Sequence, residues 1–222
     1  MLKDLDTSNL GFINSYIAKI SDLNNDLYKE RTRTEYLNKR SNKQWDKKYP
    51  LINQEPSILK KKEIYKFYLK IFNSSFDKTK KEVLLSTAFG YESWSWRVVG
   101  ISFQALSEFE NNKFKYVTRR FNRDHFDQPR NITFKKMLEN IMDYEEWWNF
   151  FWKNDQTVIL TLDQHSRVDN RKKGELERVQ YNIVPIDWRL GYFVSNPRLG
   201  FSYTLQREGE YLKRLSRIFY DD

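Results

Sequence analysis

The chain has 222 residues, no cysteine and two histidines, which excludes disulfides, cysteine-ligated zinc and a histidine-rich metal centre. Aromatic residues make up 17% of the chain, as is typical of a packed globular protein long enough to bury a core. The formal net charge of +9 favours a polyanionic partner.

Two other interpretations of the basic composition stay open at this stage. The lysine excess can reflect a low-GC genome, or it can serve contact with a membrane surface. No window approaches the ~18 consecutive apolar residues of a membrane-spanning helix, and residues 1–12 lack an apolar core of signal-peptide length. The sequence therefore predicts no membrane span and a cytoplasmic location, and it leaves homo-oligomer formation open.

The first part of the chain has a helical pattern. Residues 8–48 are expected to form a helix, because apolar residues recur at steps of three and four from Phe12 to Leu27. Pro50 and Pro56 bracket a break after this helix. A second helix is predicted over residues 57–73, with Ser57 as its N-cap.

These signals divide the chain into two units. We predict an N-terminal helical arm over residues 1–50 and a main α+β domain over residues 51–222, with a sub-boundary near residue 131. The run at residues 82–91 fits a strand or a helix equally well.

The segment at residues 93–111 resembles the core of a helix-turn-helix. Gly100 would be the turn glycine, Ile101 the buried turn residue and Ser102 the N-cap of the second helix, in which Ala105 and Leu106 would pack inward. The implied recognition helix carries two glutamates and no cation, so a core helix kinked at a glycine is the alternative.

A cationic stretch rich in aromatic residues follows directly. Residues 113–136 carry eight basic residues against Asp124 and Asp127, with five aromatic rings between them. Cations neutralise phosphates, and rings can stack on bases. The residues predicted to contact nucleic acid are Ser102, Gln104, Lys113, Lys115, Arg119, Arg120, Arg123 and Arg130.

Both histidines have acidic neighbours. His125 lies between Asp124 and Asp127, and His165 follows Asp163 at the end of a predicted strand. A histidine can act as a general base, and carboxylates can hold Mg²⁺ or Mn²⁺. If the two groups converge, they predict a metal-assisted phosphodiesterase with Asp127 and Asp163 as metal ligands. The alternative is that each histidine has a structural or surface role.

The last third of the chain is expected to combine helices and strands. Residues 143–152 predict a helix capped by Asp143 whose tryptophans form a core stripe or, alternatively, a partner surface. The further elements predicted are a helix capped by Thr133, a strand at 157–162, a polar loop from His165, a strand region at 175–186, a β-hairpin at 191–205 and a closing helix at 208–220.

The predicted fold class is α+β, with a helical N-terminal half, a helix-rich centre and a C-terminal antiparallel sheet closed by a helix. The predicted function is nucleic-acid binding, double-stranded DNA in the first place, with a metal-dependent endonuclease as its catalytic form. The alternative is a non-catalytic interaction or structural protein that uses the tryptophan-rich segment 143–152.

Overall fold

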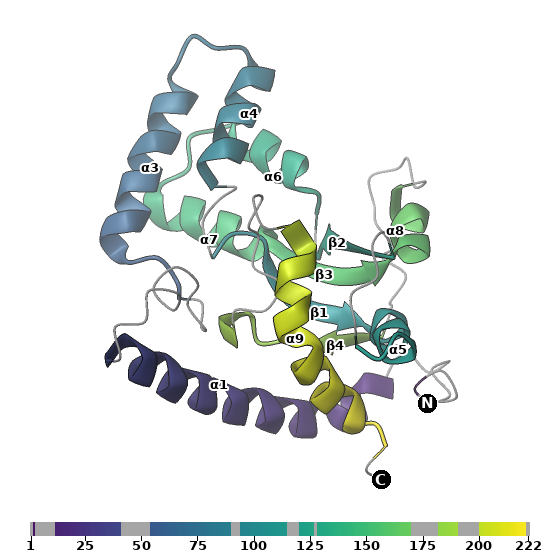
Figure 1. Ribbon diagram of the computed structural model, residues 1–222. Coiled ribbons are helices and arrows are strands. Elements are labelled where there is room, and N and C mark those ends of the chain that lie inside the picture. The colour runs from purple at the N-terminus through teal and green to yellow at the C-terminus, as the bar shows by residue number, and fades with distance from the viewer. Residues whose placement is uncertain are drawn as a thin grey trace.

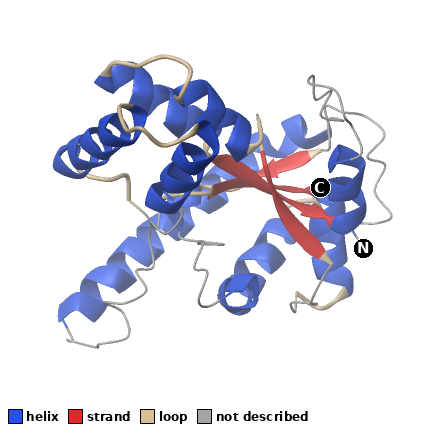
Figure 2. Cartoon of the chain, turned by 90° about the horizontal axis from the view of Figure 1, so that it is seen from above, coloured by secondary structure: helices blue, strands red, loops and turns tan. Residues whose placement is uncertain are grey.

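The computed structural model describes residues 2, 12–40, 54–89, 94–114, 120–126, 128–169, 182–190 and 200–220. A four-stranded sheet lies between groups of helices (Figures 1 and 2), so the α+β class is confirmed. The strands are β1 (Arg97–Ser102), β2 (Phe121–His125), β3 (Gln156–Thr161) and β4 (Ile183–Pro185). The helices are η2 (Phe12–Tyr16), α1 (Ile17–Arg40), α3 (Ile58–Phe72), α4 (Lys78–Phe89), α5 (Phe103–Asn111), α6 (Arg130–Met137), α7 (Tyr144–Asn154), α8 (Leu162–Asp169), η3 (Trp188–Leu190) and α9 (Gly200–Arg217).

The sheet is mixed, with strand order β2-β3-β1-β4. Its two inner strands, β1 and β3, run parallel, and each edge strand is antiparallel to its neighbour. Two of the four strands come from the centre of the chain rather than from its C-terminal part. The strand predicted at 157–162 is confirmed as β3, whose β-branched residues Thr157, Val158 and Ile159 are buried.

Two hydrophobic clusters form the core. The first unites apolar side chains of α1, α5 and α9 with β1, β3 and β4. The second unites α3, α4, α6 and α7 and is strongly aromatic. Apolar residues of α1 such as Ile20 and Leu27 belong to the first cluster together with Leu212 of α9, so α1 packs on the rest of the fold. The boundary near residue 50 stays a prediction, since residues 41–53 lie outside the described ranges.

Local capping explains where the helices of the second cluster begin. The Ser57 hydroxyl accepts a hydrogen bond from the Lys60 backbone amide at 3.3 Å, and the Asp143 carboxylate accepts one from Glu146 at 2.8 Å. Both predicted caps are confirmed. Trp147 and Trp148 are buried in α7, which confirms the core stripe and leaves neither ring available as a partner surface.

The helix-turn-helix prediction is wrong. Residues 97–102 form β1, because the β-branched residues Val98 and Ile101 pair with β3, and Ile101 also pairs with β4. Gly100 is needed for close packing rather than for a turn, since a Cβ there would overlap the Ile183 side chain and approach the Val184 carbonyl oxygen within 3.2 Å. The second half of the prediction holds: the Ser102 hydroxyl caps α5 through the Ala105 amide at 3.1 Å.

The polar loop predicted around His165 is wrong for residues 162–169, which form α8 directly after β3, while residues 170–181 lie outside the described ranges. Thr161 and Gln164 form a reciprocal capping box, in which the Thr161 hydroxyl accepts from the Gln164 amide at 3.3 Å and the Gln164 side chain accepts from the Thr161 amide at 3.1 Å. The Ser102 hydroxyl donates to the same Gln164 oxygen at 2.6 Å, which links the starts of α5 and α8.

Further differences lie towards the C-terminus. The closing helix is confirmed, but α9 begins at Gly200, so the second half of the predicted hairpin is wrong; residues 191–199 lie outside the described ranges. Of the strand region 175–186, β4 is the described part. Thr133 lies inside α6, which begins at Arg130, so it is not an N-cap. Among the described helices, none is long and apolar enough to cross a membrane.

Candidate nucleic-acid interface

The predicted cationic surface of residues 113–136 does not form a single exposed patch. Lys113 and Arg120 are exposed, whereas Arg123 is half-buried and Arg130 is buried. Lys115, Arg119 and Asp127 lie outside the described residues. Of the two contacts predicted on α5, Gln104 is exposed, but Ser102 is fully buried beneath Gln164 and cannot reach a ligand.

Two of these arginines instead join Arg97 in a buried centre around Asp155. Asp155 links α7 to β3, and the strands on either side of β3 bring Arg97 and Arg123 to it. The Arg130 Nε lies 3.6 Å from the Asp155 Oδ1, and the Trp96 backbone amide donates to the Asp155 Oδ2 at 2.8 Å. We call Arg97, Arg123, Arg130 and Asp155 the arginine centre.

Trp96 forms the outer wall of the arginine centre. Its ring centroid lies 5.0 Å from the Arg123 guanidinium carbon, 4.9 Å from that of Arg130 and 4.7 Å from the centroid of the His125 ring. Its φ of 58° is a left-handed conformation that bulky residues rarely adopt. The Asp155 contact to its amide and the two guanidinium contacts to its ring hold the residue in this conformation.

Burial controls the electrostatics of the arginine centre. Burial lowers the pKa of Arg97 to about 10, although Asp155 and Glu55 oppose the shift. Burial also raises the pKa of the Asp155 carboxyl, and the Arg130 charge is the largest effect that opposes this rise. At neutral pH the guanidinium groups therefore keep their protons, and the Asp155 carboxylate opposes their buried charge.

The structure does not bring the two histidines together. His125 in β2 pairs with Thr157 near the start of β3, whereas His165 lies in α8, beyond Thr161 at the end of β3. At ~3.3 Å per strand residue, the intervening length of β3 alone exceeds 10 Å. The predicted convergence of His125 with His165 is therefore wrong, and Asp127 lies outside the described residues.

Each histidine also differs from its predicted surroundings. His125 is buried beside Trp96, and its backbone amide donates to the Asp124 carboxylate at 2.8 Å. Asp163 and His165 lie on α8 rather than at the end of a strand, and at two positions apart on a helix they point about 160° away from each other. Within the described residues, no three histidine or acidic side chains gather closely enough to hold a metal ion, so the Mg²⁺ or Mn²⁺ prediction gains no assembled site.

An exposed basic surface lies elsewhere, on the α3–α4 hairpin. Residues 58–89 hold eight lysines against three acidic residues. Lys62, Lys66 and Lys70 follow one another at helical steps of four on the exposed side of α3, and we call them the lysine row. None of the three ammonium groups forms an ion pair in the part of the chain that the structure describes. The prediction of contact residues did not include the lysine row, although its spacing is visible in the sequence.

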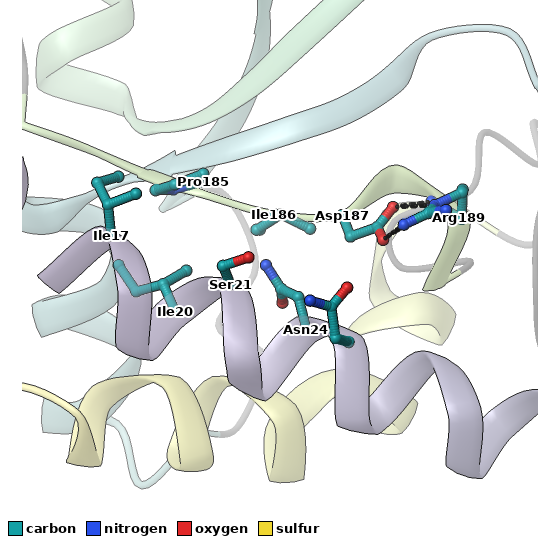
Figure 3. A pocket seen from close by; sticks show the side chains of 9 residues that line it. Ile17, Ile20, Ser21, Asn24, Pro185, Ile186, Asp187 and Arg189 are labelled. Carbon is teal, nitrogen blue, oxygen red and sulfur yellow. Dashed lines mark hydrogen bonds and ion pairs between the residues drawn. The ribbon is translucent and has the colours of Figure 1, made fainter.

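A pocket of about 300 Å³ lies between α1 and the edge strand β4 (Figure 3). Its wall combines Ile17 and Ile20 with the Asn24 amide and with Asp187, which forms an ion pair with Arg189. The Asn24 Oδ1 accepts a hydrogen bond from the Tyr211 hydroxyl at 3.0 Å. The lining contains no histidine, and its one carboxylate is bound to a guanidinium, so these side chains provide a binding surface but no general base.

Comparison of the chain with models of protein families, with curated proteins and with solved structures found no match.

Proposed function

We propose that the protein binds nucleic acid through the exposed lysines of the α3–α4 hairpin. The observation that carries the proposal is the lysine row, with three exposed ammonium groups on one side of α3. Lys60, Lys78 and Lys80 are exposed on the same hairpin. A rigid surface with this excess of cations suits a polymer of phosphates.

The proposal is for binding and not for cleavage. Cleavage of a phosphodiester needs a general base or metal ions next to the phosphate grip. Beside the lysine row the described residues include no cluster of acidic side chains or histidines: the two histidines lie on β2 and α8, and the acidic residue of α3 is the single Glu63. The hairpin is therefore equipped to hold a phosphate backbone.

Fluorescence anisotropy with labelled 20-nucleotide DNA, titrated at several salt concentrations, tests the proposal. We expect log K to fall linearly with log salt, because bound lysines release counterions. Substitution of Lys62, Lys66 and Lys70 by alanine should reduce the slope on single strands by about 2, since each neutralised phosphate contributes about 0.7.

A matched control removes the same number of charges from another helix. Lys19, Lys29 and Arg33 are exposed on α1, so their replacement by alanine lowers the net charge equally. This control should leave the salt slope near that of the unmodified protein. If both triple variants lower the salt slope equally, binding reflects the net charge of the protein and not the lysine row, which contradicts the proposal. An affinity that does not change with salt would also refute it.

A further inference from the structure

The α3–α4 hairpin also exposes large apolar side chains. Half of the ten large hydrophobic residues exposed in the described part of the chain lie on it, which marks a contact surface. They are Ile58, Leu59, Phe67, Phe76 and Val83. The two aromatic rings, Phe67 and Phe76, are 43% and 44% exposed.

The fold does not need these two rings. The hairpin already contributes a separate apolar side to the second cluster, where Ile64, Tyr68 and Leu85 are buried. Phe67 directly follows Lys66 on α3 and comes three positions before Lys70. Phe76 lies just before the start of α4. Folding of the hairpin therefore does not explain why these two rings are exposed.

Both rings lie beside cations. The Lys80 ammonium lies 4.2 Å from the centroid of the Phe76 ring, which brings a phosphate-binding charge and an aromatic face together. On α3, Phe67 lies three positions before Lys70, so these two side chains are neighbours on the helix surface. The surface thus offers phosphate contacts and aromatic faces at two places.

We infer that the preferred partner is single-stranded nucleic acid, with phosphates on the lysine row and unpaired bases stacked on Phe67 and Phe76. The inference rests on the proposed function and narrows its substrate class. A duplex presents phosphates but keeps its base faces inside the stack, so it cannot use the rings. A single strand presents both groups, and base stacking on aromatic side chains tolerates any sequence.

The test compares a labelled 20-nucleotide oligothymidine with a 20-base-pair duplex in binding titrations of the full chain. Phe67→Ala and Phe76→Ala should each weaken binding of the single strand roughly fivefold to a hundredfold, because stacking contributes ~1–3 kcal/mol per base. Both variants should leave duplex binding unchanged. Since both side chains are exposed, unfolding curves should confirm that the variants remain folded.

Phe126, which is 38% exposed next to β2, provides the matched control. Phe126→Ala should not change the affinity for the single strand, and an equal loss in this variant would overturn the inference. If the lysine variant weakens binding while neither hairpin phenylalanine matters, the inference fails and the proposed function stands. If neither nucleic acid binds, both fail. Sedimentation with phosphatidylserine vesicles that depends on the two rings, without oligothymidine binding, would assign the surface to a membrane instead.

Discussion

Arg130 is the residue that most directly compensates the buried Asp155 carboxylate. We expect Arg130→Met to lower the free energy of unfolding by roughly 3–5 kcal/mol at pH 7.5, because it leaves a buried charge with one partner fewer. Chemical denaturation followed by circular dichroism measures the effect. Adding Asp155→Asn to this variant should lower the stability further, because Arg97 and Arg123 then lose the anion that opposes their desolvation.

The same variant has a predicted pH dependence. Burial raises the pKa of Asp155 above its unfolded value, and removal of Arg130 removes the largest opposing effect. A raised folded pKa means that stability is fully present below the unfolded pKa and is lost as pH rises through the folded pKa. The loss of unfolding free energy in Arg130→Met, relative to the unmodified protein at the same pH, should therefore be smaller at pH 5 than at pH 8. A loss of stability that is constant with pH would contradict the charge argument.

Gly100 is the second residue with a specific role. Gly100→Ala should destabilise the fold by roughly 1–3 kcal/mol, because the added methyl group overlaps Ile183 across the β1–β4 pair. The double variant Gly100→Ala/Ile183→Ala should recover part of this loss, although the close contact of the new methyl group with the Val184 carbonyl oxygen remains. Thermal unfolding of the two variants measures the difference. A double variant no better than Gly100→Ala would place the cause elsewhere.

At the scale of the elements, the capping box of Thr161 and Gln164 fixes the start of α8. Gln164→Ala removes one side of the capping box and the acceptor of the Ser102 hydroxyl, so we expect a loss of about 1–2 kcal/mol. Gln104→Ala replaces an exposed glutamine on α5 and should change the stability by less than about 0.5 kcal/mol. Equal urea midpoints for the two variants would mean that the capping box does not fix α8.

Local signals predicted the elements whose ends are set by neighbouring residues. Ser57 and Asp143 cap the predicted helices, and the apolar run of β3 forms the predicted strand. The capping box of α8 was equally readable in the sequence as threonine followed three positions later by glutamine. The segment around Gly100 failed because its local pattern fits a turn between helices, whereas pairing with β3 and β4 decides its structure.

At the scale of the whole molecule, the arginine centre could not be predicted, because it depends on the strand order and no local sequence pattern contains that order. Arg97 of β1 and Arg123 of β2 come near Asp155 because both strands flank β3, and the sequence gives no sign of that strand order. The same topology separates His125 from His165 along β3. The lysine row was visible from its spacing, but only the fold identifies its exposed side.

The two hydrophobic clusters should unfold as one unit. Trp94 of the second cluster lies just before β1, whose Val98 belongs to the first, and α7 of the second cluster continues through Asp155 into β3. Leu212→Ala, a cavity in the first cluster, should lower the stability by about 2–5 kcal/mol. Because the strands connect both clusters, the whole molecule should respond to this local cavity.

Tryptophan fluorescence can test this cooperativity, because Trp94, Trp147 and Trp148 are buried in the second cluster, away from Leu212. In Leu212→Ala the fluorescence midpoint in urea should shift together with the circular dichroism midpoint. Leu85→Ala, a cavity in the second cluster, is the reciprocal variant and should also give one shared transition. A fluorescence midpoint that stays in place while the circular dichroism curve splits would show that the sheet does not couple the clusters, and that each unfolds independently.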